Sequence, residues 1–174
     1  MTWTDAINGV FTTIAVDSLD RPVNISLPGS GIAPVTAVYT PQGQIASMTQ
    51  ASVAASHVET FQYYPSGPSA GLLESETDPA GLTTSYQYDP AGRVVKEVLP
   101  DGSTVGFSYD ADGNLITVVP PGEPAHDFTY DAVNQTASDT SPTVTGSAPL
   151  AFHYTYNLDR QLTGIAYPDG TTVS

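Results

Sequence analysis

The chain has 174 residues and a formal net charge of −14, because 18 Asp and Glu residues outnumber four Lys and Arg residues. A surface of this sign repels phosphate backbones and anionic lipid headgroups, so we expect no nucleic-acid partner and no membrane insertion. The absence of cysteine excludes a disulfide framework and a thiolate metal site. Fifteen Gly and fifteen Pro residues argue against long helices, and frequent Tyr, Thr and Val favour strands.

The first 80 residues contain weak copies of a short repeat. In each copy a strand-like segment ends at an anchor residue that a turn signal follows, and the anchors are Val16, Tyr39 and Tyr63. Between the last two anchors, residues 50–59 come closest to the apolar spacing of a helix, and we interpret them as strand or loop. This part of the chain therefore predicts hairpins with decayed sequence signals.

Residues 81–174 contain clear copies of the same repeat. The anchors Tyr88, Tyr109 and Tyr130 are 21 residues apart, which sets the base unit, and longer steps elsewhere reflect insertions in loops. A fourth clear copy has its anchor at Tyr156. The aromatic, aspartate, glycine and arginine positions of the motif are occupied by Tyr86, Tyr88, Asp89, Gly92, Arg93, Phe107, Tyr109, Asp110, Gly113, Phe128, Tyr130, Asp131, Tyr154 and Tyr156.

Each unit has the pattern of a β-hairpin. An aromatic–polar–aromatic triplet places both rings on one face of a strand. The Asp-x-x-Gly segment that follows is typical of a tight turn, and we expect positive φ at Gly92 and Gly113. A second strand, such as 94–99, then leads to Pro-Asp-Gly or Pro-Pro-Gly, another turn signal. The sequence predicts an all-β fold of about seven antiparallel hairpins that form a curved or spiral sheet.

The segments that begin at Tyr86 and at Phe107 resemble the YD repeat of bacterial Rhs proteins, insecticidal Tc toxin subunits and animal teneurins. The resemblance implies a ribbon of strands that spirals into a hollow shell. In the bacterial members the shell encloses a C-terminal toxin domain, and in teneurins it lies in an adhesion ectodomain. The chain departs from the pattern in places: Asn157 replaces the motif Asp, and nothing matches the aspartyl autoprotease segment that closes the Rhs core.

The resemblance also carries expectations about context. The partners would be the remainder of the same repeat shell and an enclosed C-terminal toxin domain. The full-length protein would be bacterial and extracellular or at the cell surface, with its export signal outside this chain. Both ends fall inside the repeat, so we expect residues 1–174 to be a single array, weak over 1–80, clear over 81–174 and truncated at both ends.

Three chemical alternatives have structural explanations. Asp110, Asp112 and Asn114 match the start of an EF-hand loop but lack its distal bidentate Glu, so we interpret them as a turn and expect no metal. The histidines His57, His126 and His153 lack the short spacing of a metal pair. Glu74 and Glu76 could form the carboxylate pair of a glycoside hydrolase, but we expect both beside a turn and facing water, so we rank the hydrolase hypothesis last. We expect no catalytic residue, no cofactor and no enzyme activity.

Two hypotheses remain for the tyrosine rows. In the first, they pack within the wall of a structural scaffold, because periodic aromatic residues usually bury. In the second, they form a surface that binds a carbohydrate or a partner protein. The wall hypothesis is the one we prefer.

Overall fold

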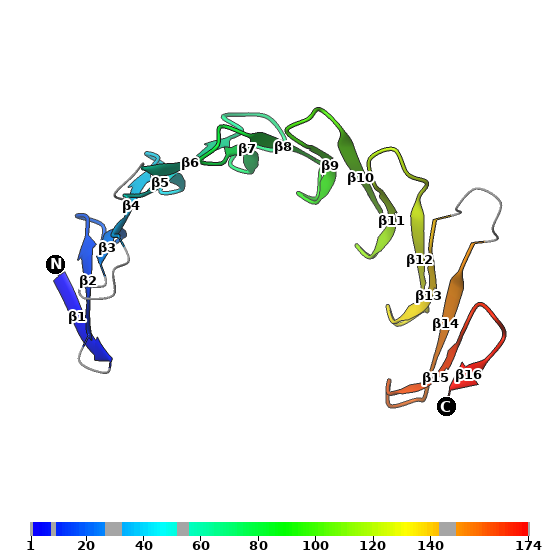
Figure 1. Cartoon of the computed structure of the whole chain (residues 1–174). Coiled ribbons are helices and arrows are strands. Elements are labelled where there is room, and N and C mark those ends of the chain that lie inside the picture. Colours follow the sequence, from blue (N-terminus) through cyan, green and yellow to red (C-terminus); the bar gives the residue numbers. More distant parts are fainter. Residues whose placement is uncertain (1, 8–9, 27–32, 52–55, 143–148, 174) are drawn as a thin grey trace. The chain divides into compact units, whose positions relative to one another are not determined.

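The computed structural model describes residues 2–7, 10–26, 33–51, 56–142 and 149–173. The chain divides into two units, residues 1–85 and 86–174, and each is described by itself. The described residues form sixteen β-strands, and each strand lies beside the one that precedes it in the sequence (Figure 1). They include no helix with the length and apolar character needed to cross a bilayer.

The first unit contains seven strands and the start of an eighth, all paired antiparallel. Its strands are β1 (Thr2–Ile7), β2 (Val10–Val16), β3 (Pro22–Ser26), β4 (Val35–Tyr39), β5 (Ile45–Gln50), β6 (His57–Tyr63), β7 (Leu73–Thr77) and β8 (Thr83–Tyr88). The segment 50–59 is strand at both ends, because β5 ends at Gln50 and β6 begins at His57. Residues 52–55 lie outside the described part of the chain.

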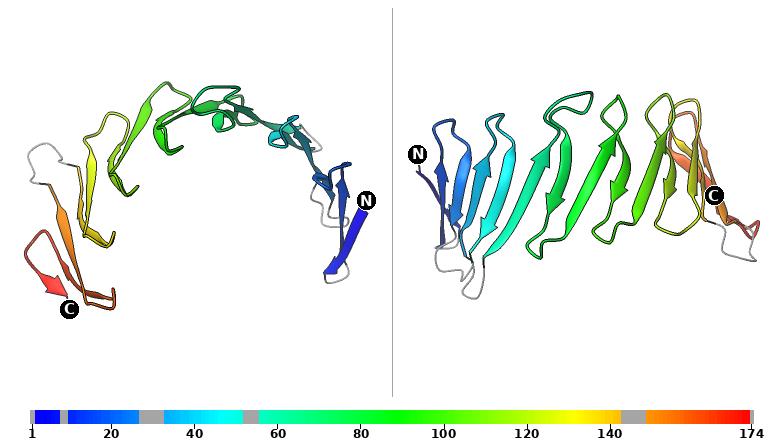
Figure 2. Two further views of the ribbon diagram at one scale, coloured as in Figure 1. Left: turned by 180° about the vertical axis from the view of Figure 1, so that it is seen from behind. Right: turned by 90° about the horizontal axis from the view of Figure 1, so that it is seen from above.

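The second unit contains the end of β8 and eight further strands, with the same antiparallel pairing. These strands are β9 (Val94–Val98), β10 (Thr104–Tyr109), β11 (Leu115–Val119), β12 (His126–Tyr130), β13 (Thr136–Thr140), β14 (Ala151–Tyr156), β15 (Leu162–Ala166) and β16 (Thr172–Val173). The connections alternate between the two edges of the unit (Figure 2). The expected all-β fold of antiparallel hairpins is confirmed.

The predicted repeat coincides with the hairpins. Each anchor residue, from Val16 to Tyr156, is the last residue of an even-numbered strand. At most of these anchors the register shifts: Ser108 faces Thr117, whereas the next residue, Tyr109, faces Leu115. Ile116 is thus the extra residue of a β-bulge, which re-aims the start of the following strand. These turns all lie on the side of the unit at which the even-numbered strands end, and we call this side the anchor edge.

The turns at the anchor edge share one backbone pattern. In the β10–β11 turn the Gly113 N–H donates to the Asp110 carbonyl oxygen (3.2 Å), and the Asp110 N–H donates to the Asn114 carbonyl oxygen (3.0 Å). The pattern requires positive φ at its fourth residue, where Gly92 has φ of 80° and Gly113 of 92°, as predicted. In decayed copies the same position is taken by residues with a Cβ atom, including Asn134 (φ 63°) and Arg160 (φ 64°).

The sheet has two chemically different faces, and the side chains described in it form no buried apolar core. In β12, His126, Phe128 and Tyr130 are half-buried, whereas Asp127 and Thr129 on the opposite face are exposed. Hydroxyl groups pair across that polar face; the Thr129 and Ser138 oxygens, for example, are 2.7 Å apart. Among the residues with described side chains, Ser138 alone is buried, with 8% of its surface exposed. Backbone ladders and side-chain hydrogen bonds therefore have an unusually large share in holding the fold.

The positive φ at Arg160 gives a first prediction. A left-handed conformation costs a residue with a Cβ atom about 1–2 kcal/mol, and glycine avoids this cost. Arg160→Gly should raise the free energy of unfolding by about 1 kcal/mol, because part of the gain is offset by the greater freedom of glycine in the unfolded chain. Arg160→Ala is the matched control, since it removes the same charge and keeps the Cβ atom. Urea denaturation of both variants measures the difference, and equal stabilities would contradict the turn geometry.

Candidate functional site

Five anchor tyrosines bond their hairpin to the one before it. Their hydroxyl groups donate to the carbonyl oxygen of the first residue of the preceding odd-numbered strand, as Tyr109 does to Val94 (2.9 Å). We call this interaction the tyrosine latch. The other latches join Tyr39 to Pro22 (2.8 Å), Tyr63 to Ile45 (2.9 Å), Tyr130 to Leu115 (2.8 Å) and Tyr156 to Thr136 (2.9 Å).

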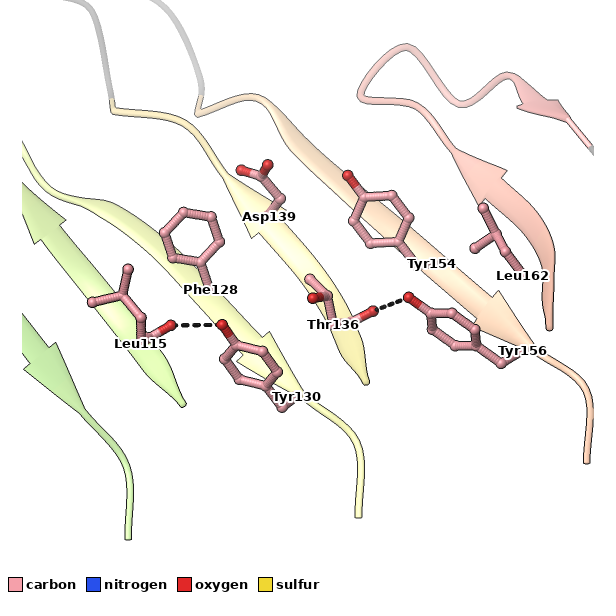
Figure 3. A pocket seen from close by; sticks show the side chains of 8 residues that line it. All are labelled: Leu115, Phe128, Tyr130, Thr136, Asp139, Tyr154, Tyr156 and Leu162. Atoms are coloured by element: carbon pink, nitrogen blue, oxygen red, sulfur yellow. Dashed lines mark hydrogen bonds between the residues drawn. The ribbon is translucent and has the colours of Figure 1, made fainter. Parts of the chain in front are cut away.

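The latch lies where the backbone ladder between hairpins stops. Strands β11 and β12 pair only through Thr117–Asp127 and Val118–His126, at the far end of both strands from the anchor edge. Near the anchor edge, the Tyr130 hydroxyl reaches across to Leu115 instead (Figure 3). The side chain therefore closes a gap that main-chain hydrogen bonds leave open.

Two arginines reinforce the latch. The Arg93 guanidinium lies 4.6 Å from the centre of the Tyr109 ring, and Arg21 lies 4.5 Å from the ring of Tyr39. Arg93 also pairs with Asp89 at 2.7 Å through both Nε and Nη2, and its Nη1 donates to the Asp110 carbonyl oxygen (3.3 Å). A cation over an aromatic ring is stabilising. One side chain thus connects its own turn to the next turn.

Amide side chains take the place of arginine in other repeats. Asn114 Nδ2 donates to Asn134 Oδ1 (2.9 Å), and Gln135 Nε2 donates to the Arg160 carbonyl oxygen (3.1 Å). In the first unit, Gln44 Nε2 donates to the Gly71 carbonyl oxygen (2.6 Å). In these three repeats, the residue that follows a turn therefore bonds to the next turn along the anchor edge.

The motif aspartates accept hydrogen bonds from within their own turns. Asp110 Oδ1 accepts the N–H groups of Asp112 (3.0 Å) and Asn114 (2.8 Å), and Oδ2 accepts from Asn114 Nδ2 (2.9 Å). These donors already use both oxygens of the carboxylate that the calcium alternative would need. Among the described residues, no three His, Cys, Asp or Glu side chains gather as metal ligands would.

The same hydrogen bonds shift the acidity of these groups. The side-chain bond from Asn114 holds the pKa of Asp110 below its ordinary value of 3.8, since it stabilises the ionised form. The side-chain bond from Arg21 lowers the pKa of Asp17, and the backbone N–H of Arg93 lowers that of Asp89. Asp101 and Asp169, in turns at the other edge, also have a lowered pKa, because Ser103 and Thr171 donate to them.

His126 has a partner that the sequence did not indicate. Its Nε2 contacts Asp139 Oδ1, and its ring stacks on Phe128 with the ring centres 4.6 Å apart. The two-residue spacing of His126 and Phe128 could have revealed the stacking, because both lie on one face of β12. The contact with Asp139 depends on the register between β12 and β13, which no local pattern determines. His57 and His153 lie in β6 and β14 as exposed residues.

The carboxylate pair considered for hydrolysis is split by a bulge. Leu73 faces Tyr63, but Ser75 faces Gln62, so Glu74 is the extra residue of the bulge. Glu76 faces Phe61. The two-residue spacing of Glu74 and Glu76 thus does not have the regular strand alternation that the paired-carboxylate alternative assumed.

The second unit has a concavity of about 450 Å³ on its aromatic face (Figure 3). Four aromatic rings and the Asp139 carboxylate give it a mixed apolar and acidic lining. Burial, with a smaller contribution from Asp139, raises the pKa of Tyr154, and burial followed by the charge of Asp110 raises that of Tyr130. The lining residues are Leu115, Phe128, Tyr130, Thr136, Asp139, Tyr154, Tyr156 and Leu162.

The motif residues predicted from the sequence are spread along the sheet and do not converge on one centre. The aromatic pairs end strands β8, β10, β12 and β14, and the Asp, Gly and Arg positions occupy the turns that follow. The pairs of β12 and β14 come together, because Phe128, Tyr130, Tyr154 and Tyr156 line the concavity. The motif residues thus form a repeated connection between hairpins, and the concavity lies on the aromatic face of the second unit.

Comparison with known proteins agrees with this geometry. The Teneurin YD-shell family matches residues 2–174, which is nearly the whole chain. The chain belongs to the teneurin YD-shell family. No curated protein matches this YD-shell chain in sequence.

Solved structures share the YD-shell fold at low sequence identity. A crystal structure of TcdB2-TccC3 without its hypervariable C-terminal region has a TM-score of 0.74 at 17% identity, over 94% of this chain. A Tc holotoxin pore from Photorhabdus luminescens has a TM-score of 0.73 at 19% identity, over 91% of this chain. The YD-shell chain spans only 9% of the length of either solved chain.

The tyrosine latch can be tested by removing a single oxygen atom. Tyr130→Phe deletes the hydroxyl that bonds to Leu115 and leaves that carbonyl without this donor, so the free energy of unfolding should fall by about 0.5–1.5 kcal/mol. Tyr154→Phe is the control, because Tyr154 lines the same face and is not an anchor. It should change stability by less than about 0.5 kcal/mol. Thermal unfolding of both variants makes the comparison, and equal losses would argue against the latch.

The lowered pKa of Asp110 predicts acid sensitivity. The stability that its hydrogen bonds contribute is fully present above the ordinary value of 3.8 and is lost as the pH falls through the lower folded value. Unfolding should therefore become easier between about pH 5 and pH 2, and less steeply so in Asp110→Asn. Asp112→Asn serves as the control, since it removes the same charge from an exposed side chain. Identical pH profiles for the two variants would rule out the proposed role of Asp110.

Proposed function

We propose that the chain is a wall segment of a YD shell in a larger protein, and that this shell encloses or displays a toxin or an adhesion domain. One observation carries the proposal: no apolar side chain described in the structure is buried, although the sheet has an aromatic face. A single layer of sheet normally buries its apolar face against a second layer. We infer that further parts of the same protein cover this face.

The side-chain chemistry supports a wall rather than a catalyst. The anchor tyrosines spend their hydroxyl groups on latches, and the motif aspartates spend their carboxylates on turns. The hydroxyl and carboxylate groups that catalysis or hydrogen bonding to a sugar would need free are thus engaged in joining hairpins. We therefore assign the YD motif a structural role and no part in a reaction, and we prefer this role to a carbohydrate-binding surface.

The context of the wall follows the family. The solved relatives include a TcdB2-TccC3 structure described as lacking a hypervariable C-terminal region, and a Tc holotoxin pore. We propose by analogy that the partners are the rest of the shell and a C-terminal domain of the same protein. We place the full-length protein outside the cell or at its surface, in a bacterium, where a net charge of −14 keeps the wall soluble.

Protease protection in the full-length protein tests the enclosing wall. In the intact protein, a C-terminal domain inside the shell should be cut far more slowly than the same domain expressed alone. A combined Tyr109→Phe, Tyr130→Phe and Tyr156→Phe variant should loosen the wall and speed the cleavage several-fold, because three latches are lost. Tyr154→Phe should leave the rate unchanged.

The outcomes distinguish a wall that encloses a domain from a wall that displays one. A domain that is cut rapidly while residues 1–174 resist cleavage would indicate display on the outside of a wall. Cleavage within residues 1–174 of the intact protein, at the rate of an unfolded chain, would overturn the wall itself.

A further inference from the structure

The chain uses arginine to cover anchor tyrosine rings in some repeats and not in others. Arg21 covers Tyr39 and Arg93 covers Tyr109. Each arginine directly precedes the residue whose carbonyl oxygen accepts the latch from that tyrosine, Pro22 in one case and Val94 in the other. The position of the covering residue is therefore fixed by the latch.

The same position holds shorter, neutral side chains around the concavity. Asn114 directly precedes Leu115, the latch acceptor of Tyr130, and Gln135 directly precedes Thr136, the acceptor of Tyr156. Both amides bond instead to the next turn. The chain thus supplies no guanidinium from these positions to the two anchor rings that line the concavity.

The concavity has the chemistry that a guanidinium would fill. Besides the two anchor rings, it presents the rings of Phe128 and Tyr154 and the carboxylate of Asp139, which is 30% exposed (Figure 3). His126 contacts only Oδ1 of that carboxylate. Arginine stacks on aromatic faces and pairs with carboxylates, and its apolar stem packs against residues such as Leu115. About 450 Å³ is sufficient room for one such side chain.

We propose that this concavity binds an arginine side chain of another polypeptide segment. Two features favour a cationic occupant: the chain carries a net charge of −14, and its own arginines cover the equivalent rings elsewhere. The inference goes beyond the wall function and does not depend on it, because it concerns one hollow on one unit. The expected partner is an extended segment that places an arginine over Tyr130, Tyr154 and Tyr156.

The first test compares two peptides that differ in charge alone. The probes are the blocked pentapeptide Gly-Gly-Arg-Gly-Gly and the same peptide with neutral citrulline in place of arginine. In NMR titrations of the chain, the arginine peptide should shift the ring signals of Tyr130, Tyr154 and Tyr156 in a saturable manner. The citrulline peptide should bind on the order of tenfold more weakly, because it lacks the charge that the rings and Asp139 attract.

Two variants locate the site. Gln135→Arg should place an internal guanidinium over Tyr156, raise the melting temperature and abolish peptide binding. Gln44→Arg is the matched control, since it adds the same charge at the equivalent position of the first unit and leaves the concavity open. Asp139→Asn should weaken the binding of the arginine peptide about tenfold and leave the binding of the citrulline peptide unchanged.

Three results would overturn the inference. One is the absence of a saturable shift with the arginine peptide. Another is binding of the citrulline peptide as tightly as the arginine peptide. If a neutral hexose then shifted the signals of the same three rings, the concavity would be assigned to carbohydrate. The third is that Gln44→Arg and Gln135→Arg weaken the binding of the arginine peptide equally. This would indicate long-range repulsion and no site at the concavity.

Discussion

The hydroxyl of each latch tyrosine supplies the hydrogen bond that the backbone between neighbouring hairpins lacks. Within a hairpin the ladder continues to the turn, but between β11 and β12 it stops after two residue pairs. Because no apolar side chain that the structure describes is buried, little else holds such an open end. The latch bonds the first residue of one hairpin's second strand to the last residue of the next hairpin's first strand. The arginine stacking and the turn-to-turn bonds are all arranged around it.

The bulge explains why a tyrosine is needed at the anchor. The extra residue, Ile116 in the β10–β11 hairpin, moves Leu115 out of regular alternation and opposite Tyr109. The Leu115 carbonyl oxygen then points along the sheet toward the following hairpin, where Tyr130 donates to it. A phenol is long enough to span the gap and carries a donor at its tip. Val16 has no hydroxyl, so a copy with valine at the anchor keeps the bulge and gives up this bond.

Local features of the fold could be predicted from the sequence, and contacts across strands could not. Tyr-x-Tyr-Asp-x-x-Gly contains the strand alternation, the turn and the positive φ of Gly92, because each depends on neighbours within a few residues. The latch acceptors Val94, Leu115 and Thr136 share no side-chain type, since the accepting group is a backbone carbonyl. The His126–Asp139 contact depends on a register that the bulge shifts. The concavity depends on the latches and on this strand register, so the sequence pattern did not reveal it.

Sequence differences between the repeats also make one connection between hairpins different from another. If every copy kept arginine after the turn, each anchor ring would be covered from within and the aromatic face would be chemically uniform. The exchange of arginine for Asn114 and Gln135 keeps the turn-to-turn bonds, because an amide can still donate to the next turn. The replacement removes only the positive charge. The stability of the connection between hairpins and the chemistry of the aromatic face can therefore vary separately. A repeating sheet can in this way change the chemistry of one face locally without altering the hydrogen bonds that hold its hairpins together.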